Sequence, residues 1–126
     1  MREVILLFNF TEKEKRNKVT RALFPLRIKI KEIEKEDYLN SIGYLAGNKE
    51  LSAVEEVYTG EELEGEMLVM AGLSSARIDQ VLKALRKSGA GNIPYKASLT
   101  PTNQHWNVRK LFEEIKEEHE RMHKEG

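Results

Sequence analysis

The stretch YKASLTPTNQHW, residues 95–106, concentrates polar and aromatic groups behind an alternating run. Its candidate ligand-binding residues are Thr100, Thr102, Asn103, His105 and Trp106, the last being the only tryptophan of the chain. Hydroxyls and amides bind polar or anionic ligands, and a histidine exchanges protons near neutral pH. The structural alternative is a helix start, in which Thr100 or Asn103 is the N-cap and Trp106 packs against the sheet.

The stretch HERMH, residues 119–123, matches the HExxH pattern, in which two histidines one helical turn apart bind zinc and a glutamate activates water. A catalytic zinc also needs a third protein ligand and a walled cavity. Here the surrounding residues are almost entirely charged, and the chain has no cysteine to serve as a thiolate ligand or nucleophile. We therefore predict no metal site, no cofactor and no identifiable catalytic residue.

Hydrophobic patterning predicts four strands that position these loops. Residues 4–8 and 66–72 are continuous apolar runs, which is typical of strands covered on both faces. Residues 26–33 and 95–100 alternate apolar and polar side chains, which is typical of half-exposed edge strands. In the first of these, lysines such as Lys29 and Lys31 face outward.

A helix is expected after each strand. The first begins with a capping box formed by Thr11 and Glu14, and the third is capped by Ser74 or Ser75. The four helices are expected over about 11–23, 35–46, 75–88 and the last twenty or so residues. Residues 47–65 are rich in glutamate, and they are either an acidic insertion or an extra short helix.

This βαβαβαβα order predicts one α/β domain over residues 1–126. Right-handed crossovers between two central apolar strands and two edge strands give a flavodoxin-like parallel sheet of order 2-1-3-4, with helices on both faces. A ferredoxin-like fold with antiparallel neighbours is the second choice. In the parallel sheet, one crevice collects the ends of three strands, and we expect it to bind through Asn9, Thr11, Ser74 and the residues from Thr100 to Trp106.

The charges are balanced overall but segregated along the chain. The 21 Lys/Arg and 21 Asp/Glu leave a net charge of zero, with the basic residues concentrated in 1–31 and the acidic ones in 32–66. Nucleic-acid binding through the basic residues 13–31 is an alternative, but the neutral net charge of the chain and the lack of interleaved aromatics in this stretch argue against it. No apolar stretch is long enough to span a membrane, and a cytoplasmic location is expected.

Three stretches resemble an uncharacterised bacterial domain family of unknown function: ILLFNF, EMLVMAGL and YKASLTPTNQHW with the following LFEEIKEEHE. The resemblance implies a small stand-alone cytoplasmic protein and supplies no site residues. The residues themselves favour a non-catalytic module whose crevice binds a small anionic ligand or a protein partner. The rival hypothesis is a small enzyme acting on an anionic metabolite, with His105 as its acid or base.

Overall fold

The computed structural model describes residues 2–125, and it describes side chains for residues 2–122. Strands and helices alternate along the described chain, as the sequence predicts. The strands are β1 (Val4–Phe8), β2 (Lys29–Ile33), β3 (Met67–Ala71) and β4 (Tyr95–Ser98). The α-helices are α1 (Lys13–Leu23), α2 (Ile42–Leu45), α3 (Ser75–Lys87) and α4 (Val108–Glu125), with 3-10 turns at Phe24–Leu26, Lys35–Asp37 and Asn103–His105.

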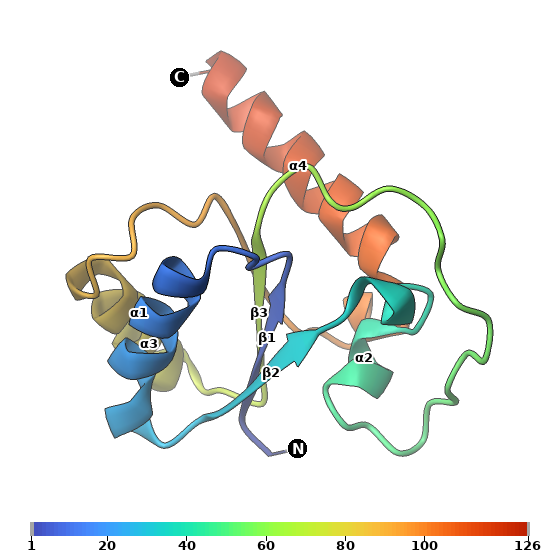
Figure 1. Ribbon diagram of the computed structural model, residues 1–126, viewed down its shortest axis with the longest axis horizontal. Helices are drawn as coiled ribbons and strands as arrows, with labels where there is room; N and C mark the ends of the chain where they lie inside the picture. The colour runs from blue at the N-terminus through green and yellow to red at the C-terminus, as the bar shows by residue number, and fades with distance from the viewer. Residues whose placement is uncertain (1, 126) are drawn as a thin grey trace.

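The sheet separates two layers of helices. Figure 1 shows it edge-on, with α1 and α3 on one side and α2 and α4 on the other. All residues of β1 and β3 are buried, which confirms them as the central strands, whereas β2 and β4 form the edges. Alternate residues of β1 and β3 therefore serve two separate apolar clusters, one under each helical layer. Within the described residues, no helix is long and apolar enough to cross a membrane.

The strand order β2-β1-β3-β4 is the predicted one, but the strand directions are not. β1 is parallel to β2 and β3 is parallel to β4, whereas β1 and β3 are antiparallel. The prediction of a wholly parallel, flavodoxin-like sheet is therefore wrong. An apolar run identifies a buried strand without giving its direction, and the long connection from β2 to β3 can return the chain to either end of the sheet.

The antiparallel central pair gives the fold an approximate twofold axis. The units β1-α1-β2 and β3-α3-β4 each contain two parallel strands joined by a helix, and α1 packs against α3. The register places Leu6 opposite Val69, at the middle of both strands. Adding 63 to the number of a β1 residue gives the equivalent residue of β3. Because the strands are antiparallel, the first residue of each strand lies opposite the last residue of the other. The fold is thus two similar βαβ units paired through their first strands.

The predicted helix over 35–46 is largely replaced by other structure. Only the turn Lys35–Asp37 and the four-residue α2 form there, because between them the segment pairs with the chain before α4, through a β-bridge of Ser41 with Asn107. The amide of Ile42 donates to the carbonyl of Trp106, and the amide of Val108 donates to the carbonyl of Tyr38.

Residues 47–65 form an irregular acidic insertion, and the extra-helix alternative is wrong. Side-chain contacts anchor the insertion in place of helical hydrogen bonds. Buried Asn40 accepts from the amide of Val54 at 2.7 Å, and the hydroxyl of buried Tyr38 donates to Glu62 at 2.5 Å. Burial, together with the adjacent carboxylate, raises the pKa of Tyr38 above its usual range.

The two long helices on the α1–α3 face begin differently. Ser74 caps α3 as predicted, since its hydroxyl accepts from the amide of Arg77 at 3.2 Å. The capping box predicted for α1 is wrong, because the helix begins at Lys13 after Glu12, which makes no side-chain cap. Thr11 lies one residue too early and is exposed. The residue types of the capping box are present, but the N-cap position is Glu12 instead of Thr11.

Candidate functional site

The antiparallel central pair separates the residues that the sequence predicts in one crevice. The carboxyl ends of β1 and β2 lie at one end of the sheet, along the strand direction, and those of β3 and β4 lie at the opposite end. Asn9 and Thr11 therefore lie at one end of the sheet, while Ser74 and the residues from Thr100 to Trp106 lie at the other end. The two groups do not share a cavity.

Asn9 ties the end of β1 to the acidic insertion. Its backbone is left-handed, with φ of 64°, and its amide donates to the carbonyls of Leu63 at 3.0 Å and Gly65 at 3.4 Å. The charged lining of the cavity of about 270 Å³ beside Asn9 and Thr11 consists of four glutamates and only two cations: Glu32, Glu34, Glu36, Glu62, Arg16 and Lys35. This concentration of carboxylates is the opposite of the anion site that we expected from these loops.

Asn103 organises the turn after β4. Its side-chain oxygen accepts from the backbone amide of Thr100 at 2.8 Å, and its backbone amide donates to the Thr100 hydroxyl at 3.0 Å. Its side-chain Nδ2 donates to the carbonyl of Ser98 at 3.0 Å. These three bonds explain why the residue is buried although it is polar. Much of the hydrogen-bonding capacity of this loop thus closes the loop itself.

Thr102 and His105 are exposed at the tip of the same loop. Across the described residues, the side chain of His105 has neither a hydrogen bond nor an ion pair that would orient it. General acid–base catalysis needs a positioned proton donor or acceptor. The geometry gives no support to His105 as a catalytic group.

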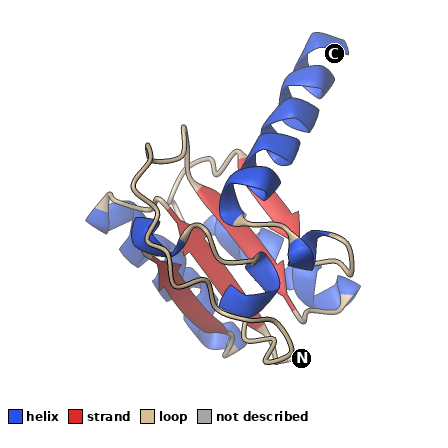
Figure 2. Ribbon diagram, turned by 90° about the vertical axis from the view of Figure 1, so that its right-hand side faces the viewer, coloured by secondary structure: helices blue, strands red, loops and turns tan. Residues whose placement is uncertain are grey.

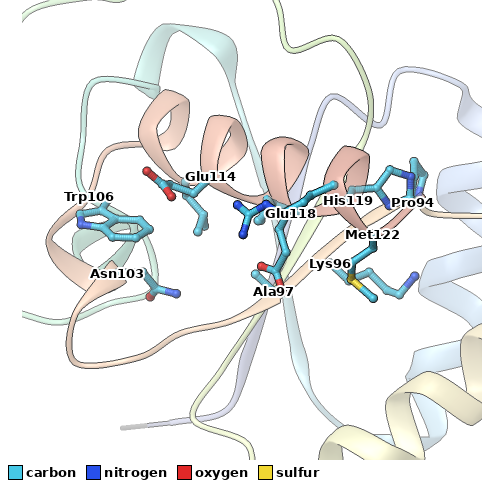
Figure 3. A pocket seen from close by; sticks show the side chains of 12 residues that line it. Pro94, Lys96, Ala97, Asn103, Trp106, Glu114, Glu118, His119 and Met122 are labelled. Atoms are coloured by element: carbon cyan, nitrogen blue, oxygen red, sulfur yellow. The ribbon is translucent and has the colours of Figure 1, made fainter. Parts of the chain in front are cut away.

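Trp106 and Asn103 do share a cavity, the groove between β4 and α4 (Figure 3). Trp106 is half-buried against the core, and the ammonium of Lys110 lies 5.2 Å from its ring centroid. The groove has a volume of about 520 Å³, a size typical of ligand sites. From the loop end it continues along β4, past Ala97 and Lys96 to Pro94.

Helix α4 provides the other wall of the groove. Most of its contributing residues recur at helical spacing along one stripe, with Arg121 beside it: Leu111, Glu114, Ile115, Glu118, His119, Arg121 and Met122. Figure 2 shows that α4 extends well beyond the sheet, and Met122 near its end is 66% exposed. The sequence predicts Met122 on the inward face together with Val108 and Phe112. The length of the helix could have indicated that Met122 is exposed, because the apolar positions continue beyond the sheet that the helix covers.

The outer edge of β4 is open along the groove. β4 is the terminal strand, and the amide of Leu99 donates inward to the carbonyl of Met70. Because backbone groups alternate in direction along a strand, the amide and carbonyl of Lys96 point outward, away from β3. Asn103 covers the end of this edge, where its side chain bonds to the carbonyl of Ser98 and the amide of Thr100.

The groove carries charges of both signs. Glu114, Glu118 and Arg121 line it from α4, and Lys96 lines it from the strand side, where burial lowers the pKa of the Lys96 ammonium group. His119 meets the ring of Tyr95 edge-on at 5.4 Å, and no cluster of three potential metal ligands occurs among the described residues. The side chain of His123, the other histidine of HERMH, lies outside the described residues.

The fold is an α/β domain with a mixed four-stranded sheet and a groove beside its open β4 edge. Residues 66–122 match the family model described as a domain of unknown function, DUF3783. This match supports the predicted relation to an uncharacterised domain family, and it includes every residue that lines the β4–α4 groove. No curated protein and no solved structure matches the chain.

Proposed function

We propose that the protein is a non-catalytic binding module whose β4–α4 groove takes an extended segment of a partner protein. The observation that carries the proposal is the free backbone of Lys96 beside an exposed part of the α4 stripe. An added strand pairs with such an edge through main-chain hydrogen bonds, and side-chain pockets supply specificity. The cytoplasmic location and bacterial origin expected from the sequence stay predictions.

The chemistry of the groove specifies the partner segment. Ile115 and Met122 offer apolar surface, whereas Glu114 and Glu118 favour a cation. An extended segment directs successive side chains to opposite faces, so apolar and basic residues should alternate in it. The two glutamates are balanced by two cations, Lys96 and Arg121, so the groove has no net positive charge that would select the small anionic ligand considered from the sequence. The open strand edge therefore favours a partner protein as the occupant.

Binding can be followed through Trp106, because it is the only tryptophan and lines the groove. We expect members of a library of extended peptides, with alternating apolar and Lys/Arg residues, to shift its fluorescence. Lys96→Pro should abolish this shift, since it removes an outward amide without breaking the bond network to β3. Lys96→Ala, which keeps the amide, is the matched control.

A second variant tests the helix wall. Met122→Asp alters an exposed side chain, and it should weaken peptide binding while the melting temperature stays close to that of the wild type. The proposal is rejected if no library member shifts the fluorescence. It is also rejected if Lys96→Pro is folded, as judged by circular dichroism, and binds as tightly as Lys96→Ala.

A further inference from the structure

A second groove lies on the opposite face of the sheet, between α1 and α3. Its volume is about 570 Å³, and its lining consists of five residues from α1 and the turn after it, with five from α3 and its C-cap. Each residue of the first set is matched by the residue 62 positions later, such as Arg21 by Lys83 and Ala22 by Ala84. The groove therefore lies where the approximate twofold axis emerges between the two helices.

The walls of this groove are basic on both sides. Lys18 and Arg21 line it from α1, Lys83 and Lys87 line it from α3, and no carboxylate is among the lining residues. Lys18 is 3.4 Å from Glu14, whereas Arg21, Lys83 and Lys87 form no ion pair within the described part of the chain. Four cations along one groove, three of them unpaired, attract an acidic partner.

The floor of the same groove is apolar and made of small or compact residues. Half-buried Ala22 and Ala84 line it from the two helices, and Pro25 and Leu26 add further apolar lining. Small side chains allow another chain to approach closely, and an apolar floor is stabilised when apolar side chains cover it. The surface thus combines an apolar centre with cations on both flanks.

We propose that this groove docks an amphipathic helix of a partner protein that carries an apolar stripe flanked on both sides by glutamate or aspartate. The stripe would cover the two alanines, and the acids would meet the lysines and arginine on each wall, in the helix-in-groove mode of recognition. A second copy of the chain does not fit by symmetric pairing, because it would bring cations against cations. Phosphate groups of a nucleic acid would match the walls but would leave the apolar floor uncovered.

This site is independent of the β4–α4 groove, because it lies on the other face of the sheet and contains no tryptophan. The probe is a fluorescein-labelled helical peptide of about 18 residues, with leucine at helical spacing and glutamate elsewhere. We expect it to bind in anisotropy measurements without shifting Trp106 fluorescence. The same peptide with lysine in place of glutamate should not bind.

Charge reversal locates the site. The double substitution Lys83→Glu with Lys87→Glu should weaken binding at least about tenfold. Arg86→Glu is the matched control, because Arg86 is also exposed on α3 and unpaired among the described residues, but does not line the groove. Its effect should be less than about threefold.

Three results would overturn the proposal. The first is an acidic peptide that fails to bind the wild type. The second is an equal loss in the double variant and in Arg86→Glu, which would indicate net charge alone. The third is tighter binding of an 18-base-pair duplex DNA, or of vesicles containing phosphatidylserine, than of the peptide; this would assign the basic walls to phosphate groups.

Discussion

The two βαβ units are most alike where they meet. Glu3 precedes β1 and pairs with Arg77 of α3 at 2.9 Å, while Glu66 precedes β3 and pairs with Lys15 of α1 at 2.5 Å. Each cation belongs to one unit and each carboxylate to the other. The cations also donate to equivalent carbonyls, Arg77 to Leu26 and Lys15 to Asn92, each of which precedes an edge strand by three residues.

The units differ most at their outer edges. On the β2 side, Lys31 donates to the carbonyl of Leu45 at 2.7 Å, so that the short α2 is tied to the strand. On the β4 side, the 18-residue α4 extends past the strand and leaves the groove between them. The contacts between the units are thus shared, whereas the additions behind each edge strand determine which unit has a groove beside that strand.

The largest predicted effect concerns two unlike residues at equivalent positions, Phe8 and Ala71. Both are fully buried, and the ring of Phe8 lies 6.1 Å from that of Tyr38. Phe8→Ala would make the units more alike, yet we expect it to lower the free energy of unfolding by about 3–5 kcal/mol, because it leaves a cavity. Denaturant titration measures this, with Ala71→Gly, expected to lose about 1 kcal/mol, as the control. A loss below about 1 kcal/mol for Phe8→Ala would contradict the packing described here.

A smaller effect is expected after the two central strands, where Asn9 and Gly72 both have positive φ, of 64° and 76°. Gly72→Ala introduces backbone strain, about 1–2 kcal/mol. Asn9→Gly relieves strain and loses the bonds to Leu63 and Gly65, a net loss of about 1 kcal/mol. Asn9→Ala loses the bonds and keeps the strain, and should be the most destabilising of the three in thermal unfolding. Equal losses for Asn9→Ala and Asn9→Gly would show that the left-handed backbone is unimportant.

The helix starts give a third comparison. Ser74→Ala removes the cap of α3 and should destabilise the protein by about 1 kcal/mol. Thr11→Ala removes an exposed side chain that does not cap α1, and its effect should stay within about 0.5 kcal/mol. Comparing the melting temperatures of the two variants tests this difference. A drop for Thr11→Ala comparable to that for Ser74→Ala would show that Thr11 does cap α1.

The smallest effect is a pH dependence at one of the two reciprocal ion pairs. The hydrogen bond from Arg77 lowers the pKa of Glu3 below its ordinary 4.5. A carboxyl with a lowered folded-state pKa contributes stability above its unfolded pKa and loses it as pH falls through the folded value. Stability should therefore fall less steeply in Arg77→Gln than in the wild type between about pH 5 and pH 3. Parallel curves would show that the pair adds nothing.

Hydrophobic patterning was sufficient to predict the strands, their order and the buried central pair, because the continuous apolar runs of 4–8 and 66–72 indicate buried strands. It could not predict the direction of β3, which depends on contacts such as Asn9 with the carbonyls of Leu63 and Gly65, more than fifty residues apart in the chain. Because β3 runs antiparallel to β1, the residues predicted to form one crevice lie at opposite ends of the sheet. Asn103 and Trp106 still line one groove, because they lie within a few residues of each other and move together whatever the sheet direction.

The pairing of β1 with β3 also bears on how the chain folds. Contacts within each βαβ unit join residues about 25 positions apart, whereas the central pair joins residues some 60 positions apart across the acidic insertion. Loop closure over the longer span is entropically less favourable and slows folding. We expect each unit to collapse locally before the two dock, so that the rate-limiting event is the encounter of β1 with β3.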